Sequence, residues 1–408
     1  MPALPLSLAV PPVGRRPGHW TVRDDGLASR RQQQRGTSAY DAAVPARLAD
    51  WDLSVPTEIA ADAADAESAL VSFDRESAVR LDALGGGPGP MSAILLRTES
   101  SSSSRIENLT VGAGQLASAE LGAATSANAH LVLANVRAME AALALSADLD
   151  LRAVLTMHDE LLGADPAHAG VAGALRTQLV WIGRSALSPI GADHVAPEAE
   201  DVPEAMADLM RFAAREDLPV LLQTAIAHAQ FETIHPFTDG NGRTGRAIVH
   251  AMLHGKGLLR SLTAPVSAGL LHDMDGYVAA LGAFRAGDAA PIVTTFAAAA
   301  RFSAVTGARL IADLEDAVQE SSSRLVGLRP QALGWRLLPR LVAQPVVDSA
   351  HVRRELGVSD TSALRALAQL EGASVLTETT GARRRRLWQH DGILAVLDDY
   401  AESIRRQG

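Results

Sequence analysis

Several features common in other proteins are missing from this chain of 408 residues. It has no cysteine, which excludes disulfide bonds, thiol nucleophiles and thiolate metal sites, and suits a reducing compartment. No apolar run approaches the length that spans a bilayer, so we expect no membrane partner. The opening residues, MPALPLSLAVPPVGRR, place apolar residues and prolines before the first charge, the reverse of a secretory signal. We therefore expect a loose N-terminal tail and a cytoplasmic protein.

The composition is that of a folded, acidic protein. Asp and Glu number 47 against 37 Lys and Arg, a formal net charge of −10, which argues against a general nucleic-acid coat or a membrane-surface protein. Hydrophobic residues make up 47% and charged residues 21%, as in globular rather than disordered chains. The length indicates two or three domains.

Glycine, proline and serine runs divide the chain. The run GGGPGP at residues 85–90 is the clearest break and separates a first region, 1–88, with a flexible start that includes Arg30 to Arg35. Residues 89–322 show apolar residues at helical spacing, apart from a loop or hairpin between Trp181 and Pro203. A second linker at 321–323 and 327–330 precedes a third region, 328–408.

The third region has the pattern of a small winged helix-turn-helix domain. We expect a helix at 348–356, a turn at 357–359, a second helix at 360–370 capped by Asp360, strands at 374–379 and 383–388, and a closing helix from Gly392. Arg383 to Arg386 form a basic patch on the expected wing. Such domains bind DNA or dock proteins, and both alternatives stay open here.

The segment HPFTDGNGRTGR at 235–246 holds the residues best suited to chemistry. Pro236 disfavours helix at His235, so a helix that ends there presents the imidazole at its exit. Gly240 and Gly242 let the backbone approach a ligand before a new helix begins, and a helix N-terminus binds anions. Arg243 and Arg246 fall on one face of that helix.

A base, a carboxylate suited to Mg²⁺, an anion cradle and two guanidiniums together indicate phosphoryl or nucleotidyl transfer from a nucleoside triphosphate. The alternative is an ordinary helix-turn-helix in which the glycines only permit a tight turn.

This segment resembles the signature of the Fic family, HPFx(D/E)GNGRxxR, at every specified position. Further segments resemble the family at 40–45, 94–109, 181–183, 203–212 and 265–288. The resemblance implies a mainly α fold: a Fic-type helical bundle with a short β-hairpin flap at about 185–195, preceded by an N-terminal Fic-associated region and followed by the winged helix domain. Such flaps hold a target segment as an added strand.

The resemblance implies a self-inhibited protein adenylyltransferase, which transfers AMP from ATP to a Ser, Thr or Tyr hydroxyl of a target protein. His235 would accept the hydroxyl proton and Asp239 would hold Mg²⁺. Gly242 and Arg243 favour AMP transfer over the phosphate transfer of the related Doc kinases. The implied nucleotide-binding residues are Phe237, Thr238, Gly240, Asn241, Gly242, Arg243, Arg246 and Tyr277.

Ser103 and Glu107 resemble the family's inhibitory motif, (S/T)xxxE(G/N), in a helix near 100–109. In the family this Glu pairs with the second arginine of the signature, here Arg246, and leaves ATP bound unproductively. The alternative is that the serine run at 100–104 is a flexible linker.

Other interpretations of the function and of single residues remain open. The chain could be a DNA-binding or regulatory nucleotide-binding Fic protein, a de-AMPylase that removes AMP, or a homodimer. His228 belongs either to a metal pair or, as we expect, to a helix as a satisfied residue, while His250 and His254 lack the Glu of a zinc protease and are expected to be ordinary helix residues. Tyr277 lies near the adenine, in the core, or at a self-modification site.

Overall fold

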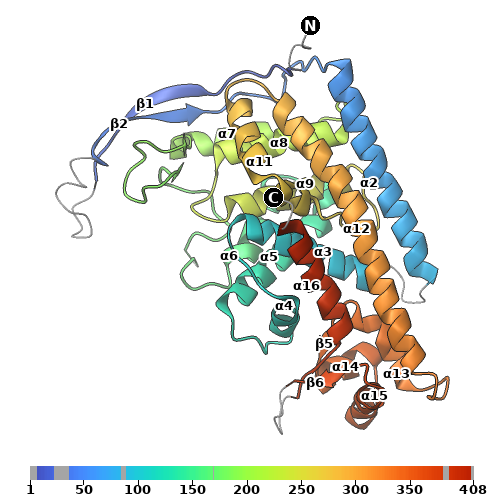
Figure 1. Ribbon diagram of the computed structural model, residues 1–408. Helices are drawn as coiled ribbons and strands as arrows, with labels where there is room; N and C mark the ends of the chain where they lie inside the picture. Colours follow the sequence, from blue (N-terminus) through green and yellow to red (C-terminus); the bar gives the residue numbers. More distant parts are fainter. Residues whose placement is uncertain (1–6, 23–35, 84–88, 169, 380–385, 406–408) are drawn as a thin grey trace. The chain divides into compact units, whose positions relative to one another are not determined.

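The computed structural model describes residues 7–22, 36–83, 89–168, 170–379 and 386–405. Helices dominate this part of the chain and the sheets are small, which confirms the mainly α prediction (Figure 1). The chain forms two compact units. The first unit comprises residues 1–65, 141–256 and 275–297, and the second unit comprises 66–140, 257–274 and 298–408.

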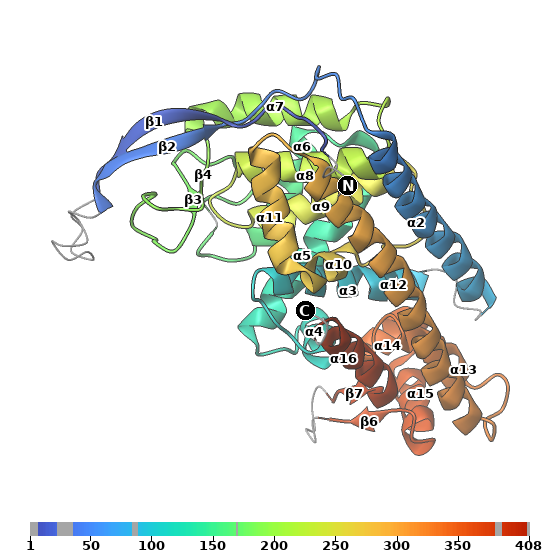
Figure 2. The same ribbon diagram turned by 45° about the horizontal axis from the view of Figure 1, so that its top comes forward.

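The first unit is built around helix α8 (Val220–Ile234), which is buried along its length. A helix that is buried on all sides needs partners on every side, and the buried side chains of α8 include polar ones such as Gln223 and Glu232. The other helical segments of this unit include η1 (Ser146–Asp148), α6 (Leu151–Leu162), η2 (Ala199–Asp201), α7 (Val202–Ala213), α9 (Asn241–Gly255) and α11 (Met274–Arg285). Helices α8 and α9 lie side by side (Figure 2). Gly245 permits this approach, because a Cβ there would lie 2.9 Å from a ring carbon of Phe231.

The predicted loose tail is wrong for the described residues of the N-terminus. Strand β1 (Gly14–Trp20) pairs antiparallel with β2 (Ser38–Val44), with Gly14 opposite Val44 and Trp20 opposite Ser38. Ahead of them Leu8 is fully buried, and its backbone N–H donates to Asp288 Oδ1 at 2.9 Å. These contacts join residues far apart in the sequence, and no local sequence pattern predicts them.

The predicted hairpin after Trp181 is present. Strand β3 (Trp181–Ile182) pairs antiparallel with β4 (His194–Val195). The N-terminal hairpin supports the loop between them: Trp20 packs edge-on against Trp181 with ring centroids 5.1 Å apart, and its indole N–H donates to Leu187 O at 2.9 Å. We refer to residues 181–195 as the flap.

The second unit contains α3 (Gly89–Ile106), α4 (Ala113–Glu120), α10 (Val266–His272) and parts of α2 (Thr57–Ala83), α5 (Ala127–Ala144) and α12 (Ala290–Arg324). The serine run at 100–104 lies inside α3, so the linker alternative is wrong. Ser100, Ser103 and Ser104 are buried, and Asn135 Nδ2 donates to Ser100 O at 2.8 Å. Small side chains allow this close packing even though their helix propensity is modest.

The predicted linker at 321–323 is also wrong, because α12 continues through it. Ser321 is buried, and its hydroxyl lies 2.8 Å from His390 Nε2. Tertiary contacts therefore outweigh the low helix propensity of three serines.

The end of the chain follows the predicted element order. It contains α13 (Leu333–Leu337), η3 (Leu338–Leu341), β5 (Val346–Val347), α14 (Ser349–Leu356), α15 (Asp360–Gly372), β6 (Thr377–Glu378), β7 (Trp388–Gln389) and α16 (Asp391–Arg405). The antiparallel sheet has the order β5-β7-β6. The cap of α15 is Ser359 rather than the predicted Asp360, because the Ser359 hydroxyl accepts from Ser362 N–H at 3.3 Å.

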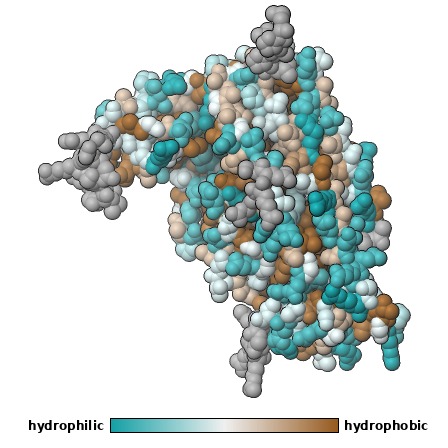
Figure 3. All heavy atoms as spheres, viewed as in Figure 1, coloured by the Kyte–Doolittle hydropathy of each residue, from teal (hydrophilic) through white to brown (hydrophobic). Residues whose placement is uncertain are grey.

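Three predicted features lie outside the described residues: the run Arg30 to Arg35, the break at 85–88, and Arg383 to Arg385 of the basic patch. Among the described residues, no helix is long and apolar enough to cross a membrane. On the face shown in Figure 3, hydrophobic residues are interspersed with hydrophilic ones.

Candidate active site

His235 sits at the point where α8 ends. Its backbone adopts the left-handed conformation, with φ 49° and ψ 62°, and its N–H donates to Phe231 O at 2.8 Å. The following proline disfavours a further helical residue, and the reversal of backbone hand terminates the helix. A left-handed conformation costs a residue with a Cβ about 1 kcal/mol, so the surrounding contacts must hold it in place.

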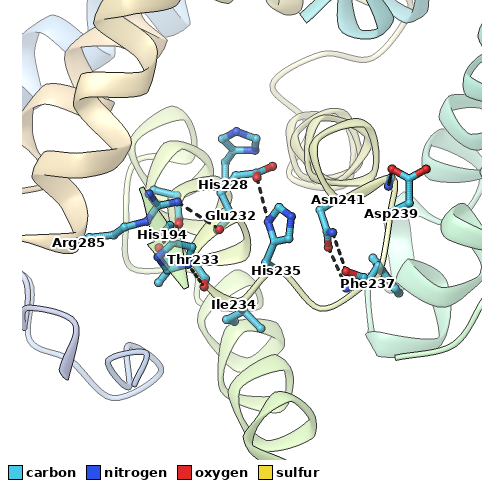
Figure 4. A network of polar contacts seen from close by, with 12 residues as sticks. His194, His228, Glu232, Thr233, Ile234, His235, Phe237, Asp239, Asn241 and Arg285 are labelled. Carbon is cyan, nitrogen blue, oxygen red and sulfur yellow. Dashed lines mark hydrogen bonds and ion pairs between the residues drawn. The ribbon is translucent and has the colours of Figure 1, made fainter. Parts of the chain in front are cut away.

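The imidazole of His235 faces a buried carboxylate. Its Nδ1 lies 3.7 Å from Glu232 Oε2, one helical turn earlier on α8 (Figure 4). The Glu232 backbone carbonyl in turn accepts a bond from Arg285 at 3.4 Å. A carboxylate beside Nδ1 favours the tautomer with the proton on that nitrogen, which leaves Nε2 as the acceptor.

The loop after His235 is closed by Asn241. The Asn241 side chain accepts from Phe237 N–H at 2.9 Å and donates to Phe237 O at 2.8 Å (Figure 4). Gly240, with φ 76°, is the N-cap of α9 and has no side chain to bond to the amides of the first turn. Any contribution of Asn241 to anion binding would therefore come from its backbone N–H, together with those of Gly242 and Arg243.

Two buried arginines project from the start of α9. Arg243 and Arg246 are 5% and 2% exposed. Arg243 Nη2 lies 3.8 Å from Asp239 Oδ2. A guanidinium at low exposure is poorly hydrated, and an anion bound beside it would gain a strong charge-assisted hydrogen bond.

The Asp239 carboxylate is half exposed beside this helix start. Its Oδ1 accepts from Gly240 N–H at 2.7 Å, and its Oδ2 lies 3.5 Å from His168 Nε2. Within the described part of the chain, no group of three or more His, Asp or Glu side chains is arranged to hold a metal ion. A cation at Asp239 would thus take its remaining ligands from water or a bound phosphate, as Mg²⁺ commonly does.

Comparison with known proteins identifies this segment. Residues 148–253 match the Fic/DOC family. The chain contains a Fic domain. Protein adenylyltransferase fic-1 of Caenorhabditis elegans is 32% identical over 111 residues, which cover 27% of this chain and 20% of that protein. A probable protein adenylyltransferase of Aquifex aeolicus is 39% identical over 70 residues, covering 17% of this chain and 22% of that one.

The chain thus spans about a fifth of the length of the curated relatives it matches. Among solved structures, a Fic family protein from Desulfovibrio desulfuricans G20 is 24% identical, covers 80% of this chain and 95% of its own, and has a TM-score of 0.48.

His158 supports the loop of residues 235–241, which we refer to as the Fic loop, and was not predicted from the sequence. Its ring stacks on Phe237 with centroids 3.7 Å apart; Nδ1 accepts from Gly173 N–H at 3.0 Å, and Nε2 lies 3.1 Å from Asp239 O. Burial lowers the pKa of His158, which keeps the ring neutral. The two bonds fix the tautomer with the proton on Nε2. No spacing in the sequence links positions so far apart.

Tyr277, in α11, is buried and hydrogen-bonded. Its hydroxyl lies 2.6 Å from His228 Nε2, and burial lowers the pKa of His228 to about 3. His228 is therefore a neutral helix residue, as the sequence indicates; its Nε2 bonds to Tyr277, while its buried Nδ1 has no hydrogen-bond partner in the described part of the chain. A buried, bonded hydroxyl argues against self-modification at Tyr277, while a place for Tyr277 beside the adenine stays a prediction.

Proposed function

We propose that this chain is a self-inhibited protein adenylyltransferase, which transfers AMP from ATP to a hydroxyl side chain of a target protein. The proposal rests on one arrangement. The His235 imidazole lies at the end of α8, and the N-terminus of α9 follows shortly after it, with Gly240 as its N-cap. Helix α9 bears the buried Arg243 and Arg246. The similar proteins from Caenorhabditis elegans and Aquifex aeolicus are named as a protein adenylyltransferase and a probable protein adenylyltransferase, which supports the proposal.

In the proposed reaction, His235 Nε2 accepts the proton of a Ser, Thr or Tyr hydroxyl as its oxygen attacks the α-phosphorus of ATP. The bond between the α-phosphorus and the bridging oxygen breaks, and pyrophosphate leaves. The N-terminal amides of α9 would hold the α-phosphate, and Arg243 and Arg246 the outer phosphates. Catalysis then consists mainly of positioning and charge stabilisation.

Asp239 fits a Mg²⁺ ion because it is a hard oxygen donor with access to water. When bound there, the ion would neutralise negative charge on the phosphates of ATP. The contact between Asp239 and Arg243 restrains the carboxylate beside the N-terminus of α9.

The inhibitory part of the proposal concerns the end of α3. Ser103 lies in the helix, and Glu107 follows its last residue, with the Glu107 N–H donating to Ser104 O at 3.1 Å. Asn108, with φ 61°, ends the segment in a left-handed turn. By resemblance to the family, Glu107 would pair with Arg246 and deny that arginine to the γ-phosphate.

Residues 328–408 are proposed to form the winged helix domain. The exposed side of α15 has few side chains suited to binding DNA. Leu364 is 47% exposed on it, and Arg365 is its only basic residue. Arg386 of the basic patch pairs with Glu378. Protein docking, including a second copy of this chain, therefore suits the domain better than DNA. A need for ATP is consistent with a cytoplasmic setting.

Mass spectrometry tests the proposed function. The Glu107→Gly protein, incubated with ATP, Mg²⁺ and host lysate, should acquire AMP on protein hydroxyls at least about tenfold faster than the unsubstituted chain. His235→Ala introduced into that variant should abolish the modification. Equal activity with and without Glu107 would contradict the inhibitory role, and AMP release from modified proteins alone would favour the reverse reaction.

A further inference from the structure

Arg176 is a buried arginine that lies in the loop before the flap. It is 4% exposed, and its side chain donates to backbone carbonyls only: to His235 O at 2.8 Å, Pro197 O at 2.7 Å, Gln178 O at 2.8 Å and Ile234 O at 3.4 Å. Burying a guanidinium is costly unless its donors are satisfied. A fork of five N–H groups can satisfy several carbonyls at once, and the three donors of a lysine cannot reproduce that pattern.

One group of these bonds fixes the backbone of the proposed catalytic base. The Arg176 backbone N–H also donates to Pro236 O at 2.9 Å, so three successive carbonyls, at residues 234–236, accept from this one residue. They lie at the C-terminal end of α8, where carbonyls lack helical partners and a cation is favourable. The same bonds hold His235 in its left-handed conformation.

The other bonds reach both sides of the flap. Gln178 precedes β3 and Pro197 follows β4. A second tie comes from the flap itself, because His194 Nε2 donates to Thr233 O at 2.8 Å (Figure 4). The ends of the flap are thus bonded to the end of α8 through one guanidinium and one imidazole.

We infer that Arg176 is a positioning residue that sets the place of the flap relative to His235. A target segment held along the flap would then present its hydroxyl at a fixed distance from the imidazole. This inference rests on the proposed function for its catalytic consequence, but the link between the flap and the end of α8 can be measured without any reaction. The alternative is a purely structural role, in which Arg176 only fills a buried space and stabilises the fold.

Hydrogen exchange on the full chain without nucleotide tests the link. We compare Arg176→Lys and Arg176→Met with the matched control Arg152→Met, which removes an exposed arginine of the same unit. If Arg176 joins the two segments, the amides of residues 181–195 and 234–237 exchange faster together in both variants, while those of α6 and α7 do not. Faster exchange throughout the unit, or no change in the flap, overturns the inference.

Kinetics of target modification test the consequence, with all variants made in the Glu107→Gly background. Misplacing a reactant by about 1 Å can cost about 100-fold in rate, so we expect kcat for the target to fall about 10- to 100-fold in Arg176→Met with the KM for ATP within about twofold. Arg176→Lys should recover part of the loss, and Arg152→Met should lose nothing. An unchanged kcat overturns the positioning role. Absence of AMP transfer in the Glu107→Gly protein itself would instead overturn the proposed function, and the exchange result would stand.

Discussion

At the scale of single residues, the Fic loop depends on two backbone positions with positive φ. His235, at 49°, ends α8, and Gly240, at 76°, leads into α9. Between them, the side chains of Asn241 and His158 bond the loop backbone at Phe237 and Asp239. The loop is therefore held from both ends and from its middle, which pre-organises the amides that would meet a phosphate.

Gly240→Ala tests this organisation. The added Cβ would lie 2.9 Å from Leu161 Cδ2 in a left-handed conformation, so we expect a loss of about 1–3 kcal/mol in the free energy of unfolding and weaker nucleotide binding. Urea denaturation and nucleotide titration measure the two effects. Gly282→Ala is the matched control, because a Cβ there meets nothing within 4 Å and the helix should gain up to about 1 kcal/mol. Equal stability of the two variants would contradict the account.

At the scale of elements, the flap depends on a buried histidine for part of its attachment. Burial lowers the pKa of His194 to about 3, so the ring stays neutral in the folded state. An unfolded histidine takes up a proton below a pH of about 6.5, and the folded one does not until far lower pH. Stability should therefore be lost as the pH falls from about 6.5 toward 3.

The slope attributable to His194 approaches about 1.4 kcal/mol per pH unit across that range. His194→Gln should show a shallower fall in the free energy of unfolding than the unsubstituted chain, while the control His19→Gln, at an exposed position, should leave the slope unchanged. Denaturant titrations at pH 7, 6 and 5 give the three slopes. Parallel curves for all three proteins would exclude a neutral buried His194.

Elements with strong local signals could be predicted from the sequence, and those formed by distant contacts could not. Pro236 and the glycines indicate where α8 stops and α9 starts. The strand GRRPGHW of β1 shows no alternation of apolar residues and exists through its pairing with β2. In the sequence, Arg176 cannot be distinguished from a surface arginine. Its five carbonyl partners come together only on folding, so no local pattern indicates them.

At the scale of the whole molecule, the proposed regulation involves both compact units. Ser103 and Glu107 belong to the second unit, and His235, Asp239 and Arg246 belong to the first. The second unit also contains residues 328–408, the proposed winged helix domain, where we propose that a regulating partner binds.

The most direct test of AMP transfer uses ATP labelled at either the α- or the γ-phosphate. We predict that the Glu107→Gly protein transfers label to protein from α-labelled ATP and none from γ-labelled ATP, and that His235→Ala in the same background removes the signal. Transfer of the γ-label, or α-label that persists without His235, would contradict the assignment of this Fic domain as an adenylyltransferase.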